Sequence, residues 1–122
     1  MRAHPGSAAV QEEACRALVS IAAGGGRQGS ARKQAAADAG ALAQIVDAMR
    51  AHSGSAAVQM EACWALASII DGTGAQADER KQEAADANAL HRIVKAMRTH
   101  SAVAAVQEQA CWALRTIATG SG

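Results

Sequence analysis

The sequence of 122 residues contains no Phe or Tyr and only two Trp, so aromatic residues make up 2% of it. Strands are rich in β-branched and aromatic residues that alternate with polar ones, and no sustained run of that kind is present. Much of the 50% hydrophobic content is alanine, the best helix former. The composition therefore predicts an all-α protein whose helices pack closely through small side chains.

The sequence also lacks an excess of charge of one sign and any long apolar run, and its number of cysteines is odd. The net charge of +1 gives no basic excess for nucleic acid. No apolar run approaches the roughly 20 residues of a membrane span, and no signal peptide is visible, so we expect no membrane association. Three Cys do not fit a disulfide framework. A reducing compartment is therefore expected, the cytoplasm or alternatively the nucleus.

One segment is present in three copies that begin 48 residues apart: VQEEACRALVSIA from Val10, VQMEACWALASII from Val58 and VQEQACWALRTIA from Val106. A fixed period of this length is typical of a repeat array. The middle copy, read as a helix, places four apolar residues on one side: Val58, Ala62, Leu66 and Ile69. Trp64 points to the opposite side. It is expected either to pack on a neighbouring repeat or to line a surface that a ligand fills.

Each period is predicted to hold a short, a medium and a long helix. The first long helix is expected from about Ala8 to Ala23, capped by Ser7 as the second is by Ser55. Gly24–Gly29 is interpreted as a linker, since it lacks the Gly-Lys-Ser/Thr ending of a phosphate loop. Ser30 and the equivalent Asp78 are good N-caps. Short helices are expected after these caps, at about 31–39 and 79–87.

Gly40 and Asn88 end the short helices and are also 48 residues apart. Both residue types tolerate a positive φ, so a sharp corner is expected at each. The medium helices should follow at Ala41–Ala51 and Ala89–Thr99. Their apolar stripes have the same spacing: Leu42, Ile45, Val46 and Met49 in one, and Leu90, Ile93, Val94 and Met97 in the other.

The start of the chain repeats the end of a medium helix. Met1–His4 matches Met49–His52, so it is expected to be the tail of a helix whose earlier part is missing, followed by a turn at Pro5. The predicted organisation is a lone third helix and two complete repeats, at 1–26, 27–74 and 75–122.

This pattern resembles the armadillo repeat over essentially the whole chain. The resemblance rests on the turn at Pro5, on Gly40-Ala41-Leu42 with Ile45-Val46, and on Glu-Ala-Cys-Trp-Ala-Leu at Glu61–Leu66. A HEAT array, the nearest alternative, has two helices per repeat and usually no such glycine corner. The resemblance implies a right-handed α-solenoid whose third helices line a concave groove. It also implies a protein that binds extended peptides or other proteins and is not an enzyme.

Importin-like members of that family carry a Trp on the third helix and an Asn four residues later. This sequence has Trp64 and Trp112, with Arg16 in the first copy. Its residues at the Asn position are Ser20, Ser68 and Thr116. A hydroxyl is shorter than an amide and lacks its paired geometry, which weighs against importin-like cargo binding.

The predicted function is therefore a scaffold that binds a protein or an extended peptide in the concave groove. Trp and Arg often dominate such binding surfaces. The expected contact residues are Arg16, Ser20, Met60, Glu61, Trp64, Ser68, Asp71, Glu108, Trp112, Arg115 and Thr116. Two alternatives remain open: a structural or assembly module without an external ligand, and an RNA-binding helical repeat. The near-neutral charge makes RNA the weaker alternative.

Three of the four His and all three Cys recur once per repeat and could suggest a metal site: His4, His52, His100, Cys15, Cys63 and Cys111. Each His–Cys pair is isolated, whereas a metal needs about four converging ligands. Three equivalent copies also argue against a catalytic Cys–His pair. We therefore expect no metal, no cofactor and no catalytic residue. Arg32-Lys33 and Arg80-Lys81 are interpreted as solvated starts of the short helices.

The first long helix lacks the two helices that should precede it in a repeat. Its core side is apolar throughout: Val10, Ala14, Leu18 and Ile21. Terminal repeats normally carry a polar outer face, and a bare patch of this kind favours association. A two-fold contact between first helices, or their exchange, covers the patch and closes. We therefore expect a homodimer.

Overall fold

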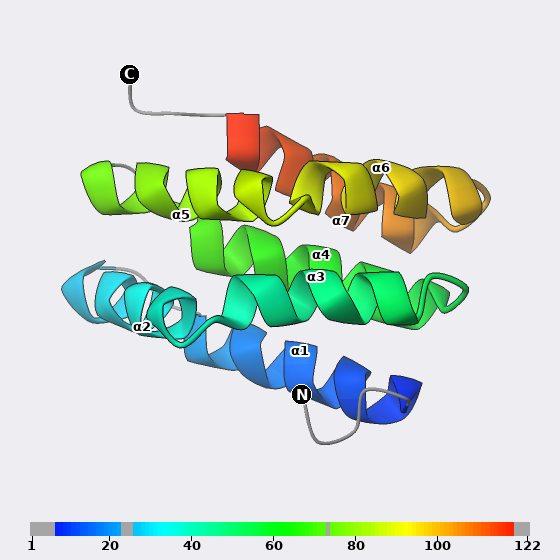
Figure 1. The fold of residues 1–122 in the computed structure, drawn as a ribbon, viewed down its shortest axis with the longest axis horizontal. Helices are drawn as coiled ribbons and strands as arrows, with labels where there is room; N and C mark the ends of the chain where they lie inside the picture. The colour runs from blue at the N-terminus through cyan, green and yellow to red at the C-terminus, as the bar shows by residue number, and fades with distance from the viewer. Residues whose placement is uncertain (1–6, 23–25, 73, 119–122) are drawn as a thin grey trace.

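The computed structural model describes residues 7–22, 26–72 and 74–118, and in these ranges the chain folds into seven α-helices without a strand (Figure 1). The helices are α1 (Ala8–Ala22), α2 (Gly26–Asp38), α3 (Ala41–Ala51), α4 (Ala56–Ile70), α5 (Ala75–Asp86), α6 (Ala89–Thr99) and α7 (Ala104–Ala118). The predicted all-α fold is confirmed for the described residues, and the helices follow the expected order of a lone long helix and two sets of short, medium and long helices. The predicted helix tail at Met1–His4 and the turn at Pro5 lie outside the described residues.

The three long helices lie side by side, with α4 between α1 and α7 (Figure 1). The helix pairs α2–α3 and α5–α6 form a second layer on one side of them. Because α4 has neighbours on several sides, almost its whole circumference is buried, including Ala67, which sits one turn from Trp64. The core draws on all seven helices, with its largest share from α4, and consists mainly of Ala, Leu, Ile and Val together with Cys and Met side chains.

The two predicted corners are confirmed. Gly40 and Asn88 both adopt the left-handed conformation, with φ of 88° and 71°. A Cβ added at Gly40 would meet nothing within 4 Å, so glycine is there for its conformation and not for space. The corners end α2 and α5 and turn the chain directly into α3 and α6.

The hydroxyls of Ser7 and Ser55 cap α1 and α4, as predicted, by accepting from the backbone N–H groups of Val10 at 3.3 Å and Val58 at 3.2 Å. The N-caps predicted at Ser30 and Asp78 are wrong. The helices α2 and α5 begin at Gly26 and Ala75, several residues earlier. The second half of the predicted glycine linker is thus helical. Asp78 instead lies in the first turn of α5, where its carboxylate suits the positive end of the helix dipole.

The prediction that the Arg-Lys pairs are solvated is wrong for α5, whereas in α2 Arg32 is exposed and Lys33 is half-buried. Arg80 is 4% exposed and Lys81 is also buried. Arg80 Nε donates to the carbonyl oxygen of Ile69 and Lys81 Nζ to that of Gly72, at 2.8 and 2.9 Å. The carbonyls at the end of a helix have no partner within the helix, and cations suit that end of the dipole. The pair therefore ties α5 to the end of α4, and Arg32 and Lys33 donate in the same way to the carbonyl oxygens of Ile21 and Ala22 at the end of α1.

The two apolar stripes have the same spacing but different surroundings. All four stripe residues of α3 are buried. Of the four stripe residues of α6, only Ile93 is buried, whereas Leu90 and Val94, expected on the core side, are exposed. The reason is that α3 contacts the following helices α5 and α6, while among the described residues no such pair follows α6.

Candidate functional site

Arg16, Trp64 and Trp112 occupy the same position of three adjacent helices, α1, α4 and α7. They form a row across the long helices. Trp64 is 37% exposed in the middle of this row, Arg16 is exposed, and Trp112 is half-buried against the core. A Trp that leaves more than a third of its surface open, on a helix that is otherwise buried, is a candidate anchor for a partner.

Arg16 is held in the row by carboxylates of two helices. Its guanidinium contacts Glu12 and Glu13 one turn away, and its Nε donates to Glu61 Oε1 of α4 at 3.4 Å. The hydrogen bond to Glu61 and the charges of Glu13, Glu61 and Glu12 raise the pKa of Arg16. Glu61, expected at the binding surface, is only 4% exposed. It lies under the row and positions Arg16.

The hydroxyl residues four positions after the row differ in how far they reach the surface. Ser20 is exposed, Ser68 is half-buried and Thr116 is buried. Thr116 Oγ1 donates to the carbonyl oxygen of Trp112 at 2.8 Å. The Thr116 hydroxyl thus bonds its own helix, a common arrangement for Thr within helices.

The remaining expected contact residues surround the row with mixed charge. The exposed ones are Asp71, Glu108 and Arg115, and Met60 is half-buried. Asp71 follows α4, and its carbonyl oxygen accepts from Arg80 Nη2 at 3.1 Å. The backbone of Asp71 is therefore fixed while its side chain stays exposed. Acidic and basic side chains both line this surface.

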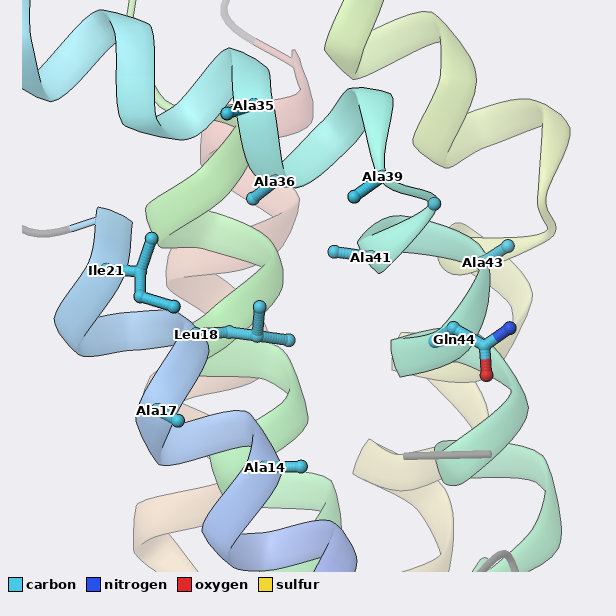
Figure 2. A pocket seen from close by; sticks show the side chains of 11 residues that line it. Ala14, Ala17, Leu18, Ile21, Ala35, Ala36, Ala39, Ala41, Ala43 and Gln44 are labelled. Atoms are coloured by element: carbon cyan, nitrogen blue, oxygen red, sulfur yellow. The ribbon is translucent and has the colours of Figure 1, made fainter. Parts of the chain in front are cut away.

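A second candidate surface lies on the outer side of α1. Val10 and Ile21 are exposed, and Ala14 and Leu18 are half-buried. All of these except Val10 line a pocket of about 950 Å³ (Figure 2). Figure 2 shows Leu18 and Ile21 of α1 pointing toward α2 and α3, which complete the pocket with small side chains: Ala35, Ala36, Ala39, Ala41 and Ala43. The apolar pattern of α1 does not by itself predict the contribution of α2 and α3, because it depends on how these helices pack beside α1.

The cysteines offer little chemistry in the folded chain. Cys15 and Cys63 are buried, and burial raises the pKa of each thiol from 9.0 to about 12. A protonated buried thiol is a poor nucleophile. Cys111 is exposed. In the described ranges, no three side chains of His, Cys, Asp or Glu gather to hold a metal ion.

Three histidines lie within the described ranges: His52 and His100 follow the ends of α3 and α6, and His91 is exposed on α6. His100 Nε2 is 2.9 Å from the carbonyl oxygen of Ser53, a bond that joins adjacent repeats. His52 is half-buried. His4 lies outside the described residues. None of the helices that the structure describes is both long and apolar enough to cross a membrane.

Comparisons with known proteins identify the repeat. The family model for the armadillo/β-catenin-like repeat matches residues 29–71 and 77–119, two consecutive copies that begin 48 residues apart. No curated protein and no solved structure matches the chain. Armadillo repeats are commonly non-enzymatic, protein-binding scaffolds. The matches, the three-helix repeat and the glycine or asparagine corner agree, and the chain belongs to the armadillo/β-catenin-like repeat family.

Proposed function

We propose that this protein is a scaffold that binds a protein segment, or an extended peptide, across the row formed by Arg16, Trp64 and Trp112. The observation that carries the proposal is the 37% exposure of Trp64 at the centre of three parallel helices. Aromatic and arginine side chains often supply most of the energy of such interfaces. Membership of a family of protein-binding scaffolds supports the same function.

The side chains around the row define how the partner would be recognised. Ser20, Asp71, Glu108 and Arg115 are exposed and available for contact, together with parts of Met60 and Ser68. Glu61 and Thr116 lie beneath the surface, where Glu61 holds Arg16. Because acidic and basic side chains are both exposed around the row, binding should depend only weakly on salt. A steep decrease with salt would instead favour the RNA-binding alternative.

Peptides selected from a random library on the wild-type protein would test the row. Trp64→Ala should abolish their binding with near-normal melting, since the side chain is partly exposed. Leu90→Ala is the matched control, because Leu90 is similarly exposed but lies on α6. Equal binding by wild type and folded Trp64→Ala would show that the row is not the contact surface. Lost stability without lost binding would favour a structural Trp.

A second candidate function is assembly through α1. Val10 and Ile21 are exposed on its outer side, next to the half-buried Ala14 and Leu18. Covering an apolar patch of a few hundred Å² contributes several kcal/mol, at roughly 25 cal/mol per Å², before the cost of association. We propose a homodimer through this face. Light scattering after size exclusion decides it: Leu18→Glu should convert a dimer into a monomer, and a wild-type monomer at high micromolar concentration contradicts it.

The three free cysteines are the basis for a further proposal, on location. Thiols persist in reducing compartments, so we propose the cytoplasm, with the nucleus as the alternative. The function proposed for the row requires no metal or cofactor. A fluorescent fusion of the full chain would show the compartment, and secretion of the fusion would contradict the proposal.

A further inference from the structure

We infer that the outer side of α5 and α6 is a docking surface for a segment of a partner protein that carries one block of acidic and one block of basic side chains. The surface belongs to the second layer and not to the row on the long helices, so the inference is independent of the function proposed for the row. It rests on two stripes of opposite charge. The acidic stripe on α5 consists of Glu79, Glu83 and Asp86, and the basic stripe on α6 consists of His91, Lys95 and Arg98.

Both stripes face away from the core. In each stripe the second and third residues follow the first by four and seven positions, so the three side chains lie on one side of the helix. The opposite side of α5 holds the buried Ala77 and Ala84, and that of α6 the buried Ala89 and Ile93. All six stripe residues are exposed. Because α5 and α6 run end to end in the second layer (Figure 1), an acidic surface continues into a basic one.

The surface stays open when one repeat stacks on another. The equivalent residues of the first repeat, 48 positions earlier, lie on α2 and α3, and these helices contact α5 and α6. All six equivalents are nevertheless exposed: Ala31, Ala35, Asp38, Ala43, Asp47 and Arg50. A further repeat packed against α5 and α6 would therefore leave both stripes accessible.

The charges of the stripes are not used inside the fold. Within the ranges that the structure describes, no ion pair involves a stripe residue. Arg80 and Lys81, the cations of α5, are buried and donate to backbone carbonyls at the end of α4. Asp86 accepts a hydrogen bond from the neutral Gln82 of its own helix, at 2.9 Å. The acidic stripe thus keeps its negative charge, and α6 contains no acidic residue that could offset the basic stripe.

The acidic stripe also works against the stability of its own helix. Glu79 and Glu83 are like charges four positions apart, an arrangement that destabilises a helix. Asp86 is the last residue of α5, where the helix dipole disfavours an anion. The equivalent face of α3 carries opposite charges instead, with Asp47 and Arg50 at 3.8 Å. Stability of the fold therefore gives no reason for the stripes, whereas an external partner does.

The order of the charges determines which partner fits. The acidic stripe would repel the continuous negative charge of RNA or of an anionic bilayer from the neighbouring basic stripe. A uniformly acidic or basic segment would likewise meet one repulsive half. A segment with carboxylates over α6 and cations over α5 is attracted along the whole surface, because complementary charges speed association and suppress wrong partners. A helical segment of about 20 residues is long enough to cover both stripes.

The probe is a labelled helical peptide of about 20 residues, built on alanine and glutamine with acetylated and amidated ends. One face carries three Glu in the first half and three Lys in the second, at the spacing of the stripes. The control peptide has the same composition, but its Glu and Lys alternate along that face, and circular dichroism verifies that both are helical. In fluorescence anisotropy with the full chain, the two-block peptide should bind saturably and roughly tenfold more tightly than the control. Its binding should weaken as salt is added.

Charge reversals locate the surface. Lys95→Glu/Arg98→Glu and Glu79→Lys/Glu83→Lys should each weaken binding roughly tenfold, because one half of the surface then repels the peptide. These residues are exposed, so the variants should fold normally. A variant with all four reversals should bind like wild type again, since the peptide can turn end to end. This recovery distinguishes recognition of a charge order from a general effect of net charge.

Two control variants should bind the two-block peptide as wild type does. Asp47→Lys/Arg50→Glu alters the equivalent face of α3, and Trp64→Ala alters the row. The inference is overturned if the two peptides bind equally, if neither binds, or if the variant with all four reversals does not regain binding. It is also overturned if RNA or anionic vesicles bind the wild type more tightly than the two-block peptide. Self-association that either pair of reversals abolishes would make a second copy of the chain the occupant and would overturn it as well.

Discussion

Arg80 Nε donates to the carbonyl oxygen of Ile69 across 2.8 Å, so the first half of α5 is bonded to the last turn of α4. The same contact occurs one repeat earlier, where Arg32 Nε donates to the carbonyl oxygen of Ile21 at 2.9 Å. Arg80 has further acceptors in Gln34 Oε1 and the carbonyl of Asp71. Burial lowers the pKa of Arg80, partly offset by Asp38 and Asp71.

Arg80→Met should therefore destabilise the protein by about 2–4 kcal/mol, since it removes several charge-assisted bonds from a buried site. Arg32→Met is the matched control. Arg32 makes the equivalent bond but is exposed, so water can replace it, and we expect a loss below about 1 kcal/mol. Urea unfolding followed by circular dichroism measures both. If the two variants lost the same free energy of unfolding, the burial of Arg80 would add nothing to the stability of the protein.

The corner at Gly40 predicts a specific order of substitutions. Gly40→Asn should cost little, because Asn88 adopts the same conformation with φ of 71°. Gly40→Val should cost about 1–2 kcal/mol or more, as a β-branched residue is strained at positive φ although the site is sterically open. Thermal unfolding of the two variants tests this. A tolerated valine would indicate that the corner can change its backbone conformation.

The side chain of Gln59 on α4 forms hydrogen bonds to the backbone at the end of α3. Its Nε2 lies 3.1 Å from the carbonyl oxygen of Met49 and 2.9 Å from that of His52. Gln59→Leu should cost about 1–3 kcal/mol, because buried carbonyls lose their donor. Gln107 makes the same bonds to Met97 and His100 but is half-buried. Gln107→Leu should therefore cost less in the same urea titration, and the reverse order would contradict this account.

The exposed Cys111 should react with a thiol reagent much faster than the buried Cys15 and Cys63. At pH 8, a thiol reagent should label Cys111 quickly and leave Cys15 and Cys63 unlabelled until the protein unfolds, because burial raises the pKa of these two to about 12. Cys111→Ser should abolish the fast phase. Rapid labelling of a second thiol in folded Cys111→Ser would contradict the burial of the other two.

The same shifts predict how stability depends on pH. In the unfolded chain the two thiols titrate near their ordinary value of 9.0, and in the folded chain near 12. The neutral thiol is the form that the fold favours, so this contribution is fully present below pH 9 and is lost as pH rises toward 12. Urea unfolding between pH 8 and pH 11 measures it. Double substitution Cys15→Ala/Cys63→Ala should flatten the profile, and an unchanged slope would assign the loss to other groups.

The sequence alone determined the period of the repeat, the helices within each repeat and the sharp corners at Gly40 and Asn88. These depend on residues close together in the chain: the spacing of apolar side chains fixes which face of a helix is apolar, and Gly40 or Asn88 fixes where the chain can turn. The three copies of Val-Gln-x-x-Ala-Cys then fixed the period. The row of Arg16, Trp64 and Trp112 could be predicted for the same reason, since equivalent positions of stacked repeats become neighbours.

Only the tertiary structure decided what covers each face. Leu42 and Leu90 have the same place in the repeat, yet Leu42 is buried and Leu90 is exposed. The difference arises because α5 and α6 of the next repeat pack against α3. The place of Glu61 in the repeat predicts a surface residue, but in the fold it is 4% exposed and its Oε1 accepts a hydrogen bond from Arg16 of the neighbouring helix. Arg80 likewise became a structural residue only once its acceptors at the end of α4 were in place. Local patterns set the helices, and the packing of one repeat on the next sets which residues remain available to a partner.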